Sequence, residues 1–265
     1  MKKFNWDAND YSNFSSEQRK WGMELISKLN LKKDDEVLDV GCGEGRITAE
    51  IALKVKRGHV TGIDSSEPMI KLAKRKFPDN EYSNLSFEVC DAREIYFNEQ
   101  FSVVFSNAAL HWVDDHTKVL NGIYKSLKPG GRILLQFGGK GNASAAFLIL
   151  DEMIKDEEWS KYFKYFKFPY NFPGDIEYSD KITKSGLTLK RAELVEKDMV
   201  HDGERGFAGW VRTTWLPYTS KIPEDKRENF ISRIIKKYIE KYPKDLNGKI
   251  HIKMVRLEVE AVKSS

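Results

Sequence analysis

A short glycine-rich loop, Gly41-Cys42-Gly43-Glu44-Gly45, follows an apolar run that ends at Val40. Glycine has no Cβ and accepts positive φ angles, so a ligand can approach the bare backbone of such a loop. A helix that begins after the loop would add free N–H groups and the positive end of its dipole. Asp39 precedes the loop and would repel a pyrophosphate but attract an ammonium or sulfonium group. The pattern therefore indicates a site for a cationic small molecule rather than for a dinucleotide.

Polar or small residues also follow three later apolar runs. Asp64 and Ser65 follow the second run of the chain, Asp91 and Ala92 the third, and Asn107 the fourth. In an open parallel sheet, ligands bind beyond the carboxyl ends of the strands, so these residues would gather at one crevice. A carboxylate such as Asp64 could accept hydrogen bonds from both hydroxyls of a ribose. Nicotinamide-dependent enzymes place an acid similarly, so Asp64 alone does not separate the two kinds of cofactor.

The elements that would position these residues alternate between strands and helices. Apolar runs bounded by turn residues predict strands, and periodic apolar faces predict the helices between them. The predicted strands are Glu36–Val40, His59–Ile63, Leu85–Val89, Phe101–Ser106, Arg132–Phe137, Leu187–Val200 and Ile250–Val262. The predicted helices include Glu17–Leu29, Ala145–Glu158, Gly206–Leu216 and Asp225–Tyr242, and a turn is predicted at Lys128–Gly131. This order predicts an α/β protein with a doubly wound, mostly parallel seven-stranded sheet.

Composition narrows the class of protein. The 265 residues are 40% apolar, which is compatible with one globular domain. No apolar run approaches the ~20 residues of a membrane span, and the N-terminal segment turns polar at once, so we expect a cytoplasmic protein without a membrane partner. Two cysteines, Cys42 and Cys90, are too few for a disulfide framework or a metal cluster, and no metal is expected. A net charge of +4 does not demand a nucleic-acid partner.

Taken in order, the glycine loop and the residues after the later strands resemble the motifs of class I S-adenosylmethionine-dependent methyltransferases over residues 35–138. The resemblance implies a Rossmann-like fold with an antiparallel last strand, and S-adenosyl-L-methionine as the cofactor. It implies that Asp91 accepts a hydrogen bond from the adenine amino group. The cofactor contacts implied as a set are Asp39, Gly41, Cys42, Gly43, Asp64, Ser65, Asp91, Ala92 and Asn107. The family often has an acid where this chain has Ser102, at a position that we interpret as structural.

The outer segments resemble methyltransferases that act on small carboxylic acids. Phe4–Trp6, Tyr11 and Trp210–Tyr218 are similar to trans-aconitate 2-methyltransferases, and Gln18-Arg19 and Leu110–Val113 are similar to juvenile hormone acid methyltransferases. The resemblance implies catalytic roles for Gln18, His111 and Trp112, and substrate contacts from Tyr11, Trp210, Arg212, Trp215 and Tyr218. It also implies one methyltransferase domain over residues 1–265, with its core at about 30–140, 187–200 and 250–262 and a helical lid from 1–29 and about 203–245.

The chemistry of such an acceptor is simple. A carboxylate has a pKa near ~4, so it is ionised at neutral pH and needs no general base. The protein would position it in line with the methyl group, and an arginine could clamp it with two hydrogen bonds. We therefore expect O-methylation of the carboxylate of a small anionic acid, by a monomer.

Three other functions stay open at this point. The first is methylation of another small nucleophile, such as an amine, a phenol or a ring carbon. The second is a non-catalytic protein that binds S-adenosylmethionine and docks a partner. The third is an RNA methyltransferase, against which the modest net charge and the lack of a separate basic domain argue.

Overall fold

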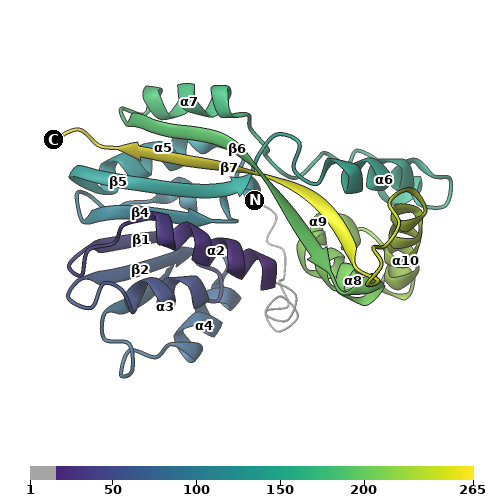
Figure 1. Cartoon of the computed structure of the whole chain (residues 1–265), viewed down its shortest axis with the longest axis horizontal. Coiled ribbons are helices and arrows are strands. Elements are labelled where there is room, and N and C mark those ends of the chain that lie inside the picture. Colours follow the sequence, from purple (N-terminus) through teal and green to yellow (C-terminus); the bar gives the residue numbers. More distant parts are fainter. Residues whose placement is uncertain (1–15) are drawn as a thin grey trace. The chain divides into compact units, whose positions relative to one another are not determined.

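The computed structural model describes the backbone of residues 16–265 and the side chains from residue 20 onward. These residues form two compact units (Figure 1). The sheet unit comprises Gln18–Lys140, Tyr170–Val195 and Arg256–Ser265, and the helical unit is formed mainly by Gly141–Pro169 and Glu196–Val255. Two long strands, β6 (Thr188–His201) and β7 (Ile250–Val262), contribute residues to both units.

Seven strands form one sheet in the order β3-β2-β1-β4-β5-β7-β6. The first five are β1 (Glu36–Val40), β2 (His59–Asp64), β3 (Leu85–Val89), β4 (Phe101–Asn107) and β5 (Leu127–Gly138). These five pair in parallel, whereas β7 is antiparallel to β5. The strand order reverses between β1 and β4, so the ligand crevice of such a sheet lies at their carboxyl ends. The predicted fold and its antiparallel last strand are confirmed.

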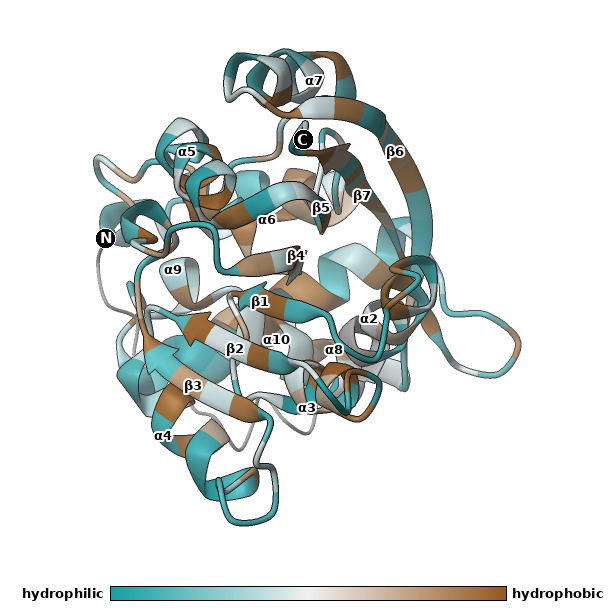
Figure 2. Cartoon of the chain, turned by 90° about the vertical axis from the view of Figure 1, so that its left-hand side faces the viewer, coloured by the Kyte–Doolittle hydropathy of each residue, from teal (hydrophilic) through white to brown (hydrophobic). Residues whose placement is uncertain are grey.

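Helices cover both faces of the sheet. On one face are α2 (Ser16–Lys28), α3 (Arg46–Ala52) and α4 (Glu67–Lys76), and on the other are α5 (His116–Ser126) and α7 (Asp175–Lys184). Adjacent residues of a strand point to opposite faces, so Leu134 packs with Leu25 of α2 while Leu135 packs with Leu120 of α5. The edge strand β6 is mostly hydrophilic, as Figure 2 shows, and carries little of this core.

Several predicted bounds differ from the structure by a few residues, and the largest difference is at the start of β5. The turn expected at Lys128–Gly131 lies inside β5, which begins at Leu127. The register of β4 and β5 shifts there, and Gly130 has a φ of 75°. The bulge is held by the C-terminal segment, because the Gly130 N–H donates to the Lys263 carbonyl at 3.0 Å. The sequence therefore predicts the turn residues, but it does not predict that they pair with the distant C-terminal segment.

The helical unit has an aromatic core. Its helices are α6 (Ser144–Lys155), α8 (Gly203–Thr214), α9 (Leu216–Thr219) and α10 (Glu224–Lys241). Helix α10 buries an apolar face that includes Phe230, Ile234 and Tyr238. Short 3-10 helices occur at η1 (Ala92–Glu94), η2 (Leu110–Trp112) and η3 (Ser160–Tyr162). Within residues 16–265, none of the helices has the length and hydrophobicity needed to cross a bilayer.

Candidate active site

The glycine loop leaves β1 and enters α3, and its three glycines have φ angles of 79°, 54° and 82°. A Cβ on Gly41 would lie 2.1 Å from the Cβ of Ala109, and one on Gly45 would lie 2.5 Å from the ring of Phe87. A Cβ on Gly43 would meet no atom within 4 Å. Packing therefore requires glycine at the two ends of the loop, while the backbone at Gly43 faces open space. That opening fits the close approach that a bound cofactor needs.

Asp64, at the end of β2, holds the loop through both carboxylate oxygens. Its Oδ2 accepts a hydrogen bond from the Gly43 N–H at 3.0 Å, and its Oδ1 accepts one from the Ser66 N–H at 2.8 Å. Burial raises the pKa of Asp64, and these two hydrogen bonds act in the opposite direction. A carboxylate has about four lone-pair positions, so Asp64 can still accept from ribose hydroxyls. Ser65, beside it, is exposed.

Asp39 lies behind the same loop and is only 2% exposed. Its Oδ2 accepts a hydrogen bond from the Thr48 hydroxyl at 2.7 Å. Burial raises the pKa of Asp39 to about 7, the bond from Thr48 lowers it, and the negative charge of Asp64 raises it. A positive group brought near Asp39 would favour the ionised form. Ionised Asp39 would stabilise a cation bound at the loop, and the contact of Asp39 with the cofactor stays a prediction.

The thiol of Cys42 belongs to the buried core, and burial raises its pKa well above the usual value. A thiol of this kind packs as a small apolar group and is not reactive. The predicted contact of Cys42 with the cofactor would therefore use its backbone.

Asp91, which follows β3, is held by its neighbour Arg93. Its Oδ1 accepts from the Arg93 backbone N–H at 2.9 Å and from Nε at 3.0 Å, and its Oδ2 accepts from Nη2 at 2.7 Å. These hydrogen bonds hold the pKa of Asp91 below its ordinary value. Asp91 is thus an ionised acceptor of fixed orientation, with Ala92 directly after it. Its bond to the adenine amino group stays a prediction. Arg93 was not singled out from the sequence.

An aromatic cluster of His111, Trp112, Tyr170 and Phe172 forms beyond β4. The rings of Trp112 and Tyr170 lie 4.8 Å apart, those of His111 and Phe172 lie 5.9 Å apart, and Tyr170 stacks on Phe172 at 5.5 Å. The His111 carbonyl accepts from the Asn171 N–H at 2.8 Å and so joins the two segments. Tyr170 and Phe172 come from a stretch in which aromatic residues are frequent, and the sequence does not say which of them reach the site.

Helix α2 approaches the end of β4 closely. A Cβ on Gly22 would lie 2.8 Å from the amide nitrogen of Asn107, so the Asn107 side chain would have to shift to accept a larger residue there. Gln18 lies one turn before Gly22 on the same helix, but its side chain is outside the described residues, as is the whole of Tyr11. The roles predicted for Gln18, Asn107 and Tyr11 stay predictions.

His111 is arranged as a neutral hydrogen-bond donor. Its Nδ1 accepts from the Gly138 N–H at 3.4 Å, which leaves the proton of the neutral ring on Nε2. Desolvation lowers the pKa of His111 well below its usual value, and the positive charge of Arg256 lowers it further. A ring of this kind is a weak base. It can donate from Nε2 to an anion.

The remaining predicted substrate residues lie in the helical unit. Trp210, Trp215 and Tyr218 are buried, and Trp215 stacks on Phe147 with ring centroids 5.3 Å apart. Arg212 is half-exposed and forms a paired contact with Glu228, in which Nε lies 2.7 Å from Oε1. The three aromatic residues therefore pack in the core of the helical unit, and Arg212 belongs to a surface ion pair. Their contact with substrate stays a prediction.

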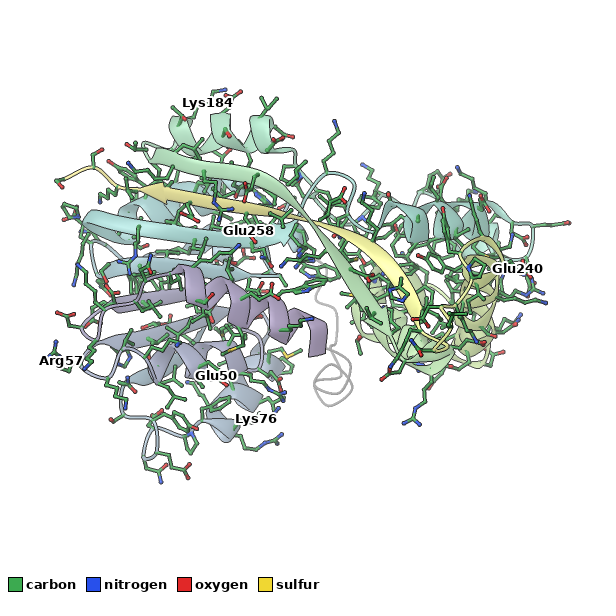
Figure 3. All side chains as sticks on the ribbon, in the orientation of Figure 1. Glu50, Arg57, Lys76, Lys184, Glu240 and Glu258 are labelled. Carbon is green, nitrogen blue, oxygen red and sulfur yellow. The ribbon has the colours of Figure 1, made fainter. Side chains whose placement is uncertain are left out.

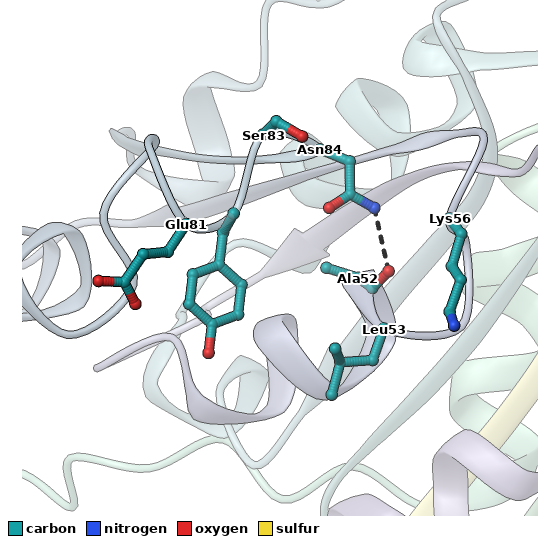
Figure 4. A pocket seen from close by; sticks show the side chains of 7 residues that line it. Ala52, Leu53, Lys56, Glu81, Ser83 and Asn84 are labelled. Carbon is teal, nitrogen blue, oxygen red and sulfur yellow. Dashed lines mark hydrogen bonds between the residues drawn. The ribbon is translucent and has the colours of Figure 1, made fainter.

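A surface pocket lies elsewhere in the sheet unit. It has a volume of about 390 Å³ and is lined by Ala52, Leu53, Lys56 and residues 81–84 (Figure 4). Asn84 closes its wall by donating to the Ala52 carbonyl at 3.0 Å. Lys56 and Asn84 precede β2 and β3, so the pocket lies at the amino ends of the strands. It is separate from the glycine loop and the aromatic cluster, which lie at the carboxyl ends.

The sheet order, the antiparallel β7 and the glycine loop after β1 define the class I methyltransferase fold. The chain belongs to the family described as "Methyltransferase domain", which matches residues 31–187. It is an S-adenosylmethionine-dependent methyltransferase.

Individual proteins that are similar to this chain are also described as methyltransferases. An uncharacterized methyltransferase of Schizosaccharomyces pombe is 40% identical over 200 residues, covering 72% of this chain and 74% of that protein. Trans-aconitate 2-methyltransferase of Rhizobium rhizogenes is 26% identical over 264 residues, covering 97% of this chain and 99% of that enzyme. The solved structure of a putative methyltransferase from Bacillus halodurans has a TM-score of 0.65 at 19% identity and covers 92% and 99% of the two chains. The last comparison shows the fold alone.

Proposed function

We propose that the protein transfers the methyl group of S-adenosylmethionine to a carboxylate oxygen of a small organic acid. The observation that carries this proposal is the state of His111. Its pKa is lowered by desolvation, and its Nδ1 is occupied by the Gly138 N–H. A phenol or an ammonium acceptor must lose a proton, and His111 is badly suited to take it. A carboxylate has no proton to lose at neutral pH.

Bound S-adenosylmethionine supplies a methyl group on a sulfonium, which leaves as a neutral thioether. The carboxylate oxygen forms the new C–O bond while the S–C bond breaks and its electron pair goes to sulfur, and no proton moves. The chain's own residues position the acid. The Nε2–H of His111 can donate to the carboxylate, and the faces of Trp112 and Tyr170 can exclude water from it.

Full-length relatives support the same class of acceptor. Trans-aconitate 2-methyltransferases from several bacteria match 95–97% of this chain at 24–26% identity. Similarity at this level does not carry a particular substrate across, so we propose the acid class and not one acid.

A methyl-transfer assay on a panel of acceptors tests the proposal. The panel contains trans-aconitate, simple mono- and dicarboxylic acids, primary amines and phenols, with formation of S-adenosylhomocysteine without acceptor as the background. We expect turnover with at least one acid, and a product that releases methanol in alkali, because methyl esters hydrolyse and N-methyl or ether products do not. An alkali-stable product formed from an amine or a phenol alone would overturn the carboxylate proposal.

A further inference from the structure

The turn that follows β3 has a fixed backbone. The Cys90 N–H donates to the Asp64 carbonyl at 3.0 Å, and the Glu94 N–H donates to the Asp91 carbonyl at 2.8 Å. The first bond joins the turn to the end of β2, and the second closes η1. The backbone of Asp91 is therefore held in place, and the freedom that is left to this residue is the rotation of its side chain.

Arg93 removes that rotation. Its backbone N–H and its Nε donate to Oδ1 of Asp91 at 2.9 and 3.0 Å, and its Nη2 donates to Oδ2 at 2.7 Å. The Nη1 group donates to Asp114 at 2.9 Å, so the guanidinium is itself held from two sides. The side chains of Asp91 and Arg93 are 21% and 22% exposed, so water competes little for the hydrogen bonds between them.

These hydrogen bonds define which part of the Asp91 carboxylate a ligand can use. A carboxylate has about four lone-pair positions, two on each oxygen. Arg93 takes both positions of Oδ1 and one position of Oδ2, so the remaining position lies on Oδ2. The same bonds hold the pKa of Asp91 below its ordinary value, so at neutral pH this position accepts a hydrogen bond and does not donate one.

We propose that Arg93 is a positioning residue that makes the cofactor site selective for the amino group of adenine. The proposal rests on the predicted contact between Asp91 and adenine. An amino group donates a hydrogen bond and so fits the acceptor position on Oδ2, whereas a purine without that group leaves the position unsatisfied. Without Arg93 the carboxylate could rotate, and ordering it when the ligand binds would cost free energy. The preference for adenine would then decrease.

The test compares two ligands by calorimetry on the full-length protein. One is S-adenosylhomocysteine, and the other is the same molecule with hydrogen in place of the amino group of adenine. We expect the wild type to bind S-adenosylhomocysteine about 10- to 100-fold more tightly, the range for a hydrogen bond to a charged group. Arg93→Met should weaken the binding of S-adenosylhomocysteine by about 3- to 10-fold, the cost of ordering one side chain, and that of the analogue by less than about twofold.

A conservative variant and a matched control accompany Arg93→Met. Arg93→Lys keeps the positive charge but not the fork of N–H groups, so it should recover only part of the preference. The control is Lys76 on α4 (Figure 3), which forms an ion pair with the buried Glu44 of the glycine loop. Lys76→Met should weaken the binding of both ligands by the same factor, because this pair supports the loop and not Asp91.

Each outcome decides the role of Arg93. A loss in Arg93→Met that is confined to S-adenosylhomocysteine would support the proposal, and the unchanged binding of the analogue would show that the variant is folded. Equal losses for both ligands would make Arg93 a support of the turn alone. Equal affinity of the wild type for the two ligands would separate Asp91 from the amino group, and either result overturns the proposal. No methyl acceptor takes part, so the result is independent of the carboxylate chemistry proposed above.

Discussion

The Thr48 hydroxyl donates to Oδ2 of Asp39 at 2.7 Å, and the bond joins the strand before the glycine loop to the helix after it. Asp39 is otherwise surrounded by protein, so burial raises its pKa to about 7, and Thr48 keeps it from rising further. A buried carboxyl that titrates near neutrality responds strongly to a charged ligand. The affinity for the cofactor should therefore depend on pH.

Affinity for S-adenosylmethionine should fall as the pH drops below about 7. The positive groups of the ligand favour ionised Asp39 and lower its pKa from about 7, so binding in this range expels a proton. The affinity should then decrease by up to about tenfold per pH unit, the limit for one coupled proton. Calorimetry from pH 5.5 to 8, in buffers of different ionisation enthalpy, measures both the affinity and the released proton.

Two variants separate Asp39 from other titrating groups. Asp39→Asn should bind the cofactor more weakly and lose the pH dependence. Thr48→Val should move the midpoint to higher pH, because the bond from Thr48 lowers the pKa of Asp39. A wild-type affinity that is constant between pH 5.5 and 7 would remove Asp39 from the binding site.

Asp64 should contribute to both binding and stability. Replacing it with alanine removes the acceptor for the Gly43 and Ser66 N–H groups and for the ribose, and we expect cofactor binding to weaken by about 1.5–3 kcal/mol, the range for charge-assisted hydrogen bonds. Asp64→Asn keeps one carbonyl oxygen for the backbone and should lose binding with a smaller drop in melting temperature. Calorimetry together with thermal unfolding distinguishes the two effects. Unchanged affinity in both variants would leave Asp64 a purely structural residue.

Glu258 is fully buried on β7, where its Oε2 accepts from Lys28 at 2.6 Å and from Arg191 at 3.0 Å, and these ion pairs should stabilise the fold. Glu258→Gln should lower the free energy of unfolding by ~2 kcal/mol, less than for a fully buried pair because Lys28 is 41% exposed. The control is Glu193→Gln, which removes a 51% exposed partner of Arg191 and should cost under ~1 kcal/mol. Urea unfolding of the two variants gives both values, and equal losses would contradict the expectation.

The pH dependence of this contribution has a defined sign. Burial raises the pKa of Glu258, but the pairs with Lys28 and Arg191 together outweigh it and leave the folded-state pKa below its ordinary value. The stabilisation is therefore complete above the unfolded-state pKa and is lost as the pH falls through the lower, folded-state value. The difference between wild type and Glu258→Gln should disappear in acid.

The sequence predicts the sheet well because its strands are buried. Parallel strands that are covered on both faces appear as continuous apolar runs, and β1 was predicted with its observed bounds, Glu36–Val40. The glycine loop was predicted because its repeated glycines mark a place where positive φ angles and close packing exclude other residues. Both signals are local, so one stretch of sequence is enough to identify them.

The part of the site that we propose for the methyl acceptor is formed by residues that are distant from one another in the sequence. Tyr170 and Phe172 contact Trp112 and His111 from a segment that is distant from them in the sequence, and no local pattern marks them. Arg256 lies in a strand whose alternating charges predict a solvent-exposed face. Helix α2 covers that face, with Trp21 over the guanidinium, so the charge is buried instead.

The role of Arg212 can be tested against its ion-pair partner. If Arg212 contacts the acceptor, Arg212→Ala should impair methyl transfer and leave cofactor affinity within about twofold, or ~0.4 kcal/mol. Glu228→Gln breaks the same surface pair but leaves the arginine, so it should leave methyl transfer unchanged. Initial rates at saturating cofactor measure the difference. If both variants retain full turnover, Arg212 serves only the surface of the helical unit.

The rate of methyl transfer should be nearly constant from about pH 6.5 to 8.5. A carboxylate acceptor, with a pKa near ~4, is ionised throughout this range. His111 stays neutral in the same range, because desolvation and the charge of Arg256 hold its pKa well below the usual value. Neither group then changes its charge, and the chemical step has no proton to remove. Single-turnover rates with saturating cofactor isolate that step from cofactor binding, which Asp39 makes pH-dependent.

His111→Asn should cost less than about tenfold in this rate, because an asparagine amide can still donate a hydrogen bond to the acid, and the loss of one such bond is worth about 1 kcal/mol. His111→Phe keeps the ring in the aromatic cluster but removes the donor, so it should be slower than His111→Asn with the same flat pH profile. A rate that climbs steeply through neutrality in the wild type, and loses that climb in His111→Asn, would mean that His111 takes a proton from the acceptor. The acceptor would then be an amine or a phenol, and the neutral donor assigned to His111 would be wrong.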